Sequence, residues 1–192
     1  MKILYFDVET TGTSYQENEI TQLAGLIEID GEVVEEFNFD VRPTNFESIS
    51  QEALEITGKT IDDLKSYPDS YTVYCDFTDI LDKYIEKFDK TDKFYPCGYN
   101  VDFDIKFLRS FFIRNKNLYL GSYLSYKAID LLPLMYFLES CEKISLENYK
   151  LGTVCAHYDI EIDAHDAMSD INATRQLYLK LKDELTGSKV QI

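Results

Sequence analysis

The alternation of apolar and polar residues predicts a group of strands at the start of the chain. A continuous apolar run over Ile3–Val8 favours a buried strand. Two more strands are expected over Ile20–Ile29 and Val33–Val41, joined at Asp30-Gly31, which is typical of a tight hairpin. A further strand is expected over Phe94–Tyr99. The first three strands are therefore predicted to form a meander.

Apolar residues recur at helical spacing in most of the remaining chain. A short helix fits Gln51–Ile56, since Ser50 is a good N-cap and Gly58 stands just beyond its end. The other predicted helices cover Tyr71–Phe88, Phe103–Asn115, Leu131–Leu138, Tyr149–Tyr158 and a last segment from Ala167. This order predicts an α/β fold with a central mixed sheet flanked by helices. We expect one domain over residues 1–185 and a frayed tail over 186–192.

Composition narrows the class of protein. The 192 residues are 45% apolar and 28% charged, as in a globular domain, and no apolar run is long enough to span a membrane. No signal segment precedes the first strand, and the four scattered cysteines favour a reducing, cytoplasmic location. The net charge of −16 argues against broad electrostatic adhesion to nucleic acid. The net charge does not exclude binding of a nucleic acid through a metal ion and a local groove.

The stretch FDVETTG places two acids at the end of the first strand. Asp7 and Glu9 are two residues apart, so their side chains point to the same face of the strand. Two carboxylates so close repel each other unless a cation neutralises them. The alternative is the wet face of an edge strand. The carboxyl ends of strands in open α/β sheets are common ligand sites, which favours a site here.

Two later stretches carry further candidate residues. GYNVDFDIKFL places Asp102 and Asp104 in the first turns of a helix, where acids often serve only to complement the helix dipole. AHDAMSDINAT places His165 just before the last helix and Asp170 one turn inside it. A lone histidine is more often structural than catalytic, but this one stands beside acids in a chain with two histidines.

In this order and spacing, FDVETTG, NVDFD and HDAMSD resemble the three motifs of the DEDDh 3′–5′ exonucleases. The resemblance covers most of the chain and is greatest to the proofreading epsilon subunits of bacterial DNA polymerase III and their stand-alone relatives. It implies a ribonuclease-H-like fold and a metal-dependent 3′–5′ exonuclease that releases nucleoside 5′-monophosphates from single-stranded or frayed DNA. The alternatives are an RNA 3′-end exonuclease and a proofreading-type module that mainly binds a polymerase.

The resemblance also implies roles for individual residues. Two Mg²⁺ or Mn²⁺ ions would be held by Asp7, Glu9, Asp104 and Asp170, with His165 as the general base. Contacts to the terminal nucleotide are implied for Thr10, Thr11, Gly12, Leu23, Asn100 and Phe103, although core packing is the alternative for Leu23 and Phe103. The family often has histidine where this chain has Tyr99.

The resemblance makes the expected partner the 3′ end of a single strand, DNA rather than RNA, together with a DNA polymerase. The chain also offers a few basic side chains near the second motif. Lys106 and Arg109 lie one helical turn apart, with Arg114 and Lys116 beyond them. They form either a basic strip along which the strand approaches or an ordinary solvated helix face.

Overall fold

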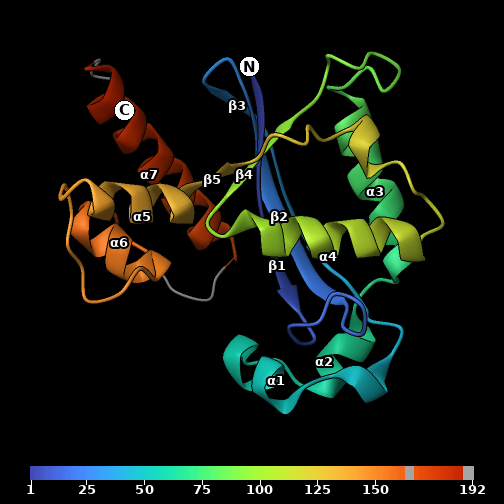
Figure 1. Cartoon of the computed structure of the whole chain (residues 1–192). Coiled ribbons are helices and arrows are strands. Elements are labelled where there is room, and N and C mark those ends of the chain that lie inside the picture. Colours follow the sequence, from blue (N-terminus) through green and yellow to red (C-terminus); the bar gives the residue numbers. More distant parts are fainter. Residues whose placement is uncertain (163–166, 188–192) are drawn as a thin grey trace.

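A single mixed sheet forms the centre of the molecule. The computed structural model describes residues 1–162 and 167–187. Its strands are β1 (Lys2–Thr10), β2 (Ile20–Ile29), β3 (Glu32–Asp40), β4 (Tyr95–Gly98) and β5 (Ile129–Asp130), in the spatial order β3-β2-β1-β4-β5. The pairs β1–β2 and β2–β3 are antiparallel, whereas β1–β4 and β4–β5 are parallel. The predicted mixed sheet, with its N-terminal meander, is confirmed (Figure 1).

Local backbone geometry explains where the first strands turn and end. Asp30 and Gly31 both have positive φ angles, 53° and 96°, which a tight hairpin between β2 and β3 requires. Near the carboxyl end of β1, the pairing with β2 shifts between Glu9 and Thr10. Such a bulge changes the direction of the side chains beside it. The irregularity therefore lies directly next to the acids of the first motif.

Helices cover both faces of the sheet. They are α1 (Gln51–Thr57), α2 (Ile61–Ser66), α3 (Ser70–Asp82), α4 (Val101–Arg114), α5 (Leu131–Ser140), α6 (Leu151–His157) and α7 (Ala167–Thr186), with single 3-10 turns at Phe46–Ser48 and Leu120–Ser122. In Figure 1, α7 lies to the left of the strands and α3 to their right. The chain therefore forms three layers, helix–sheet–helix.

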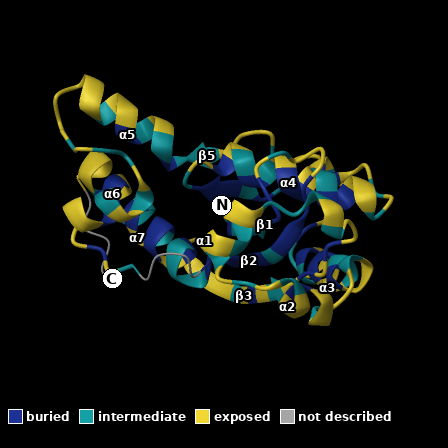
Figure 2. Ribbon diagram, turned by 90° about the horizontal axis from the view of Figure 1, so that it is seen from below, coloured by how far each residue is buried: buried dark blue, intermediate teal, exposed yellow. Residues whose placement is uncertain are grey.

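Alternation along β1 distributes its side chains between two cores. Leu4, Phe6 and Val8 pack in the cluster formed with α3 and α4. Ile3 and Tyr5 pack in the cluster that includes residues of α7. A third cluster joins α5, α6 and α7. Figure 2 shows β1 and β2 as buried strands at the centre of the molecule. Because β1 is buried on both faces, the backbone at its carboxyl end is held in position.

The structure corrects some predicted element boundaries. The helix expected over Tyr71–Phe88 ends at Asp82. Phe88, which the spacing indicated as a core position, has a side chain that is 93% exposed. The helix α2 was not predicted, although Thr60 and Asp63 form a reciprocal capping box at its start. The strand β5 was also missed. Most of the expected frayed tail lies outside the described residues.

No helix within the described residues is long and apolar enough to cross a membrane.

Candidate active site

Asp7 lies near the carboxyl end of the central strand β1. Its side chain follows Tyr5 on the face that packs against α7, and it lines a cavity of about 150 Å³. Asp170, in the first turn of α7, lines the same cavity. Residues of the first and third motifs, more than 160 positions apart in the sequence, therefore meet at one hollow.

Asp104 reaches β1 from the other side, through α4. The strand β4 ends at Gly98, and Asn100 adopts a left-handed conformation (φ 65°) before the helix begins at Val101. This abrupt turn places Asp104 one turn into the helix, where it is 4% exposed. Its Oδ1 accepts a hydrogen bond of 3.2 Å from the backbone N–H of Val8. The second motif is thereby fixed directly to the first.

Burial and mutual repulsion change the protonation of these acids. Burial raises the pKa of Asp7 to about 7, and the negative charges of Glu9 and Asp170 contribute to the rise. Burial also raises the pKa of Asp104 well above its usual range, with Asp7 adding to the effect and the Val8 N–H opposing it. Asp7 is thus close enough to Glu9 and Asp170, and Asp104 close enough to Asp7, for repulsion to disfavour the charged forms of Asp7 and Asp104.

This group of acids suits a hard divalent cation in charge and in donor type. Carboxylate oxygens are the ligands that Mg²⁺ and Mn²⁺ prefer, and a cation would remove the repulsion that raises the pKa of Asp7. Within residues 1–162 and 167–187, no three His, Cys, Asp or Glu side chains are placed closely enough to hold an ion. The fit is therefore electrostatic and chemical, and the ligand geometry is not preformed.

The turn after β1 is held by its own hydrogen bonds. The N–H of Thr11 donates to the carbonyl of Glu19 at 2.8 Å, and the Thr11 hydroxyl accepts from the Glu19 N–H at 2.9 Å. A Cβ at Gly12 would stand 2.6 Å from Oδ1 of Asn18, so only glycine fits at this close approach. Thr11 and Gly12 thus build the loop. The Thr11 N–H is engaged with Glu19, and the nucleotide contacts implied for Thr11 and Gly12 stay predictions.

The remaining residues implied as nucleotide contacts separate into two groups. Leu23 is fully buried in the core between the sheet, α3 and α4, so the structure gives it the packing role that was its alternative. Asn100 and Phe103 instead line an open cavity of about 350 Å³ beside the β1–β2 loop. This cavity, which we call the loop cavity, is also lined by Thr13, Tyr15, Gln16, Asp102, Lys106 and Phe107.

Thr10 and His165 complete the set predicted from the motifs. The hydroxyl of Thr10 donates to the carbonyl of Gly12 at 2.7 Å and so stabilises the turn. His165 lies outside the described residues, and its predicted role stays a prediction.

Comparison with known proteins identifies the family. A family model described as Exonuclease (RNase_T) matches residues 4–178. This chain belongs to that exonuclease family. Among its curated relatives, the PolC-type DNA polymerase III of Bacillus subtilis is 30% identical over 187 residues, and that of Oceanobacillus iheyensis is 31% identical over 191 residues. The aligned parts cover 97% and 96% of this chain, but the chain spans only 12% of either relative.

Solved structures show the same fold. A complex of E. coli Exonuclease I with a dT13 oligonucleotide superposes with a TM-score of 0.77 at 24% identity, covering 95% of this chain and 41% of that one. A zinc-bound form of the E. coli exonuclease–single-stranded DNA complex gives a TM-score of 0.78 at 24% identity, covering 96% and 40%. The predicted ribonuclease-H-like exonuclease fold and the family resemblance are both confirmed.

The structure places beside the acids some residues that the motifs did not indicate as site residues. Tyr5, Tyr99 and Thr174 line the cavity shared by Asp7 and Asp170. The hydroxyl of Tyr99, in place of the family's frequent histidine, donates to the carbonyl of Tyr149 at 2.5 Å. Spacing offers a signal for two of them, because Tyr5 precedes Asp7 by two on a strand and Thr174 follows Asp170 by four on a helix.

Asp130 was also missed as a neighbour of the site. It ends β5 and caps α5, and its Oδ1 accepts from the Asn100 N–H at 2.9 Å. Its negative charge contributes to the raised pKa of Asp104. No motif spacing marks Asp130, because the parallel pairing of β4 with β5 alone brings it to the start of α4.

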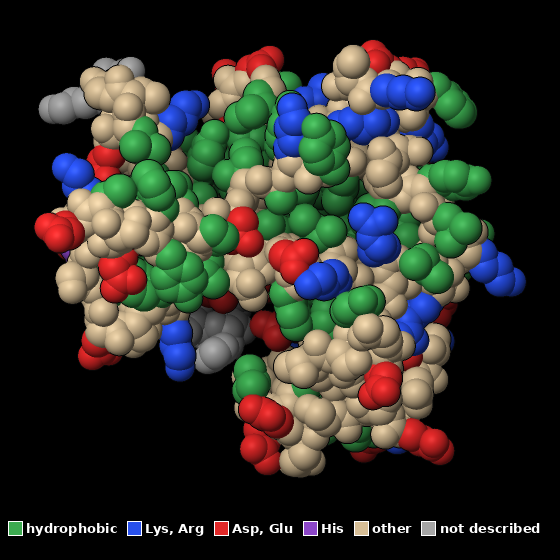
Figure 3. All heavy atoms as spheres, in the orientation of Figure 1, with side chains coloured by type: hydrophobic (Ala, Val, Ile, Leu, Met, Phe, Trp, Pro, Cys, Tyr) green, Lys and Arg blue, Asp and Glu red, His purple; other side chains and the backbone are tan. Residues whose placement is uncertain are grey.

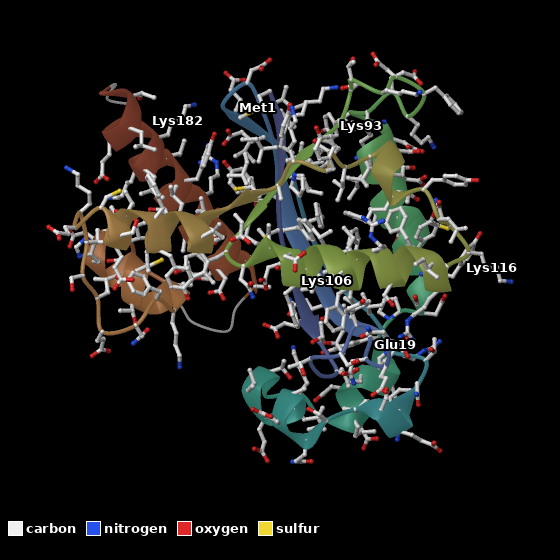
Figure 4. The ribbon with its side chains drawn as sticks, in the orientation of Figure 1. Met1, Glu19, Lys93, Lys106, Lys116 and Lys182 are labelled. Atoms are coloured by element: carbon white, nitrogen blue, oxygen red, sulfur yellow. The ribbon has the colours of Figure 1, made fainter. Side chains whose placement is uncertain are left out.

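The basic strip proposed along α4 is not a uniform surface. Arg114 forms an ion pair with the buried Glu19 at 3.4 Å and donates to the carbonyl of Asn18 at 3.1 Å, so it holds the β1–β2 loop. Lys106 is paired with Asp102 on the same helix. Figure 4 shows Lys106 on α4 and Glu19 below that helix. Arg114 is therefore a structural residue and not a free contact for a strand.

Proposed function

We propose that this chain is a metal-dependent 3′–5′ exonuclease that releases nucleoside 5′-monophosphates from the 3′ end of single-stranded or frayed DNA. The observation that carries the proposal is the meeting of Asp7, Asp104 and Asp170, from the three motifs, at the carboxyl end of β1. Membership of the exonuclease family supports the reaction class. The names of the polymerase relatives and of the oligonucleotide complexes support single-stranded DNA as the substrate.

In this proposal the four acids Asp7, Glu9, Asp104 and Asp170 hold two Mg²⁺ or Mn²⁺ ions. Such ions supply positive charge that activates water and stabilises the oxygens of a phosphodiester under attack. The protein fixes Asp104 through the Val8 N–H and Asp7 through a strand buried on both faces, so both acids are held near the carboxyl end of β1. His165, which precedes the helix of Asp170, would accept the proton of the attacking water.

The loop cavity is the proposed place for the terminal nucleotide. Phe103 and Tyr15 offer aromatic surface for a base or sugar, and Asn100 offers an amide at the start of α4. The cavity lies beside the helix that carries Asp104, so a nucleotide bound there would present its phosphate toward the acids. This arrangement favours an end-directed enzyme.

The experiment is digestion of matched DNA and RNA oligonucleotides, labelled at the 5′ end, with Mg²⁺, with Mn²⁺ and with EDTA. We expect a ladder that shortens from the 3′ end of single-stranded DNA, no reaction in EDTA, and resistance of a blocked 3′ terminus. Asp104→Asn should abolish hydrolysis, whereas Asp76→Asn, the same change at an exposed position of α3, should not.

The alternatives give different results in the same assay. Faster trimming of RNA would assign the chain to RNA 3′-end processing. Absence of hydrolysis with either metal would favour a module that only binds a polymerase. Cleavage of a circular single strand, or full activity in EDTA, would refute the proposal.

A further inference from the structure

A further hollow, distinct from the cavity of the acids and from the loop cavity, lies on the front face of the molecule. One wall is the segment between α3 and β4, and the other is the connection between α4 and β5. The hollow has a volume of about 420 Å³ and is lined by Lys87, Phe88, Lys90, Lys93, Gly121, Ser122, Leu124, Ser125 and Tyr126. Figure 3 shows Lys and Arg side chains gathered beside hydrophobic ones in the upper right of this face.

This hollow is continuous with another of about 290 Å³ that runs along α4. The two share Gly121, Leu124, Ser125 and Tyr126, and the second adds Arg109, Val101 and Asp102 from the helix. We call the two together the basic–aromatic groove. Asp102 also lines the loop cavity. The groove therefore begins at the turn of α4 where the proposed nucleotide site ends.

Two aromatic side chains in the groove are almost fully exposed. Phe88 is 93% exposed and Tyr126 is 92% exposed, the highest values for large apolar side chains in the described parts of the chain. Covering an exposed aromatic ring with a flat partner lowers the free energy, because apolar surface is removed from water. Every nucleobase has a flat face that can stack on such a ring. Lys127 lies 5.8 Å from the centre of the Tyr126 ring, so a cation accompanies this aromatic surface.

The outer hollow of the groove is opposite in charge to the chain as a whole, whereas Asp102 and Asp130 line the inner hollow beside Arg109. Three lysines and no acid line the outer hollow, although the chain carries a net charge of −16. Of the acids near this segment, Asp92 is engaged outside the groove, whereas Asp82 pairs with Lys87, one of the three lysines of the outer hollow. Asp92 accepts from Lys2 at 2.6 Å, and Asp82 accepts from Lys87 at 2.6 Å.

The free cations of the groove are Lys90 and Arg109. Neither forms an ion pair with any side chain in residues 1–162 and 167–187. Lys93 has a different role, since its ammonium group donates to the carbonyl of Ser122 and ties the two walls together. Lys90 and Arg109 are therefore available to phosphates, and Lys93 keeps the groove in shape.

From these observations we propose that the basic–aromatic groove binds the nucleotides upstream of the 3′ end of a single-stranded nucleic acid. Phe88 and Tyr126 stack on bases, while Lys90 and Arg109 contact phosphates. The inference rests on the proposed function, because it extends the same strand from the loop cavity over the start of α4. Unstacked bases are needed to cover the two rings, so a duplex is a poorer ligand.

The test compares hydrolysis of a trinucleotide with hydrolysis of longer oligothymidylates, together with binding of the longer ones in EDTA by fluorescence anisotropy. We expect KM to fall as the oligonucleotide lengthens. Phe88→Ala and Tyr126→Ala, each made singly, should raise KM for the long substrate by about five- to 150-fold, the range for loss of one stacked base, with KM for the trinucleotide and kcat unchanged. Lys90→Ala should lower the slope of log binding constant against log salt by about 0.7.

Matched controls lie on the opposite side of the molecule. Phe137→Ala removes a 59% exposed ring from α5, and Lys182→Ala removes an exposed lysine from α7, labelled far from Lys93 in Figure 4. Neither should change KM, binding or the salt slope. The groove variants should unfold at the same temperature as the wild type, because their side chains are at the surface.

The outcomes separate this inference from the proposed function. A KM independent of length, or groove variants that behave like the controls, would overturn the groove while leaving exonuclease activity intact. A groove variant that loses activity on the trinucleotide to the same extent would also overturn it. If no oligonucleotide is hydrolysed with either metal, the proposed function fails, and binding in EDTA decides on the groove alone.

Discussion

Replacing Asp7 with asparagine is expected to stabilise the metal-free protein while abolishing its hydrolytic activity. The change removes one carboxyl group from a site where burial, Glu9 and Asp170 all oppose its ionisation. Asparagine has nearly the same shape and carries no charge at any pH. The substitution therefore removes the electrostatic cost of the site without creating a cavity.

The magnitude follows from the pKa of Asp7. It rises from 3.8 to about 7 on folding, a difference of about three units, which corresponds to about 4 kcal/mol of unfolding free energy. Below pH 3.8 both states of the protein bind the proton, and the cost is absent. Between that value and about 7 only the unfolded state ionises, so stability falls as the pH rises. Above pH 7 the cost is complete and constant.

The assay is urea unfolding of both proteins in EDTA at pH 5.5 and pH 8.5. The gain in unfolding free energy of Asp7→Asn over wild type should be larger at pH 8.5 by about 2 kcal/mol, the part of the titration that lies between the two values. Asp76→Asn, an exposed acid on α3, is the control and should show no such change. Adding Mg²⁺ should stabilise the wild type more than the variant.

Two results would refute this reasoning. A variant that is less stable than the wild type at pH 8.5 would mean that Asp7 makes a favourable interaction in the folded protein. A gain that is equal at both pH values would mean that Asp7 is ionised throughout, and that the acids do not repel each other as their burial implies.

Two other predictions concern α7 and the segment before it. His165→Ala should lower the rate of hydrolysis by about 10²–10⁴-fold with metal affinity nearly unchanged. The wild-type rate should fall as the pH drops through about 6.5, the usual pKa of histidine. If calorimetric titration shows that the variant loses metal binding, His165 is a ligand or a structural residue. Arg175 pairs with the buried Glu28 of β2 at 2.7 Å, so Arg175→Met should lower the unfolding free energy by about 3 kcal/mol by leaving a buried carboxylate without its partner. Glu28→Gln/Arg175→Met should recover much of that loss in urea unfolding, and a double variant no more stable than the single one would count against the assigned cause.

Local pattern was enough to predict most of the elements and to indicate the candidate acids. The strands β1 and β2 and the helices α1 and α4 lie within a few residues of their predictions, because each has a clear apolar period and clear end signals. The three motifs also indicated the family, which the comparisons confirm. Such features depend on residues near one another in sequence, and so the sequence alone determines them.

The apolar pattern gave a wrong prediction where an apolar residue does not lie in a core. Phe88 continues the helical spacing of α3, yet the helix ends at Asp82 and the ring stands in water. Spacing shows which residues share a face of a helix, but it cannot show whether another element covers that face. The same limit applies to Leu23, whose full burial follows only from the packing of α3 and α4 on the sheet.

The sequence by itself indicated the candidate residues for the proposed chemistry, and the tertiary structure decided how they act on one another. Only the fold sets the Val8 N–H against Asp104, engages the Thr11 N–H with Glu19, and turns Arg114 into a partner of that same buried acid. The raised pKa of Asp7 likewise depends on its burial and, besides the neighbouring Glu9, on the carboxylate of Asp170 from a distant part of the chain. Ionisation, donor availability and exposure are set by neighbours in space, and those neighbours exist only once the layers have packed.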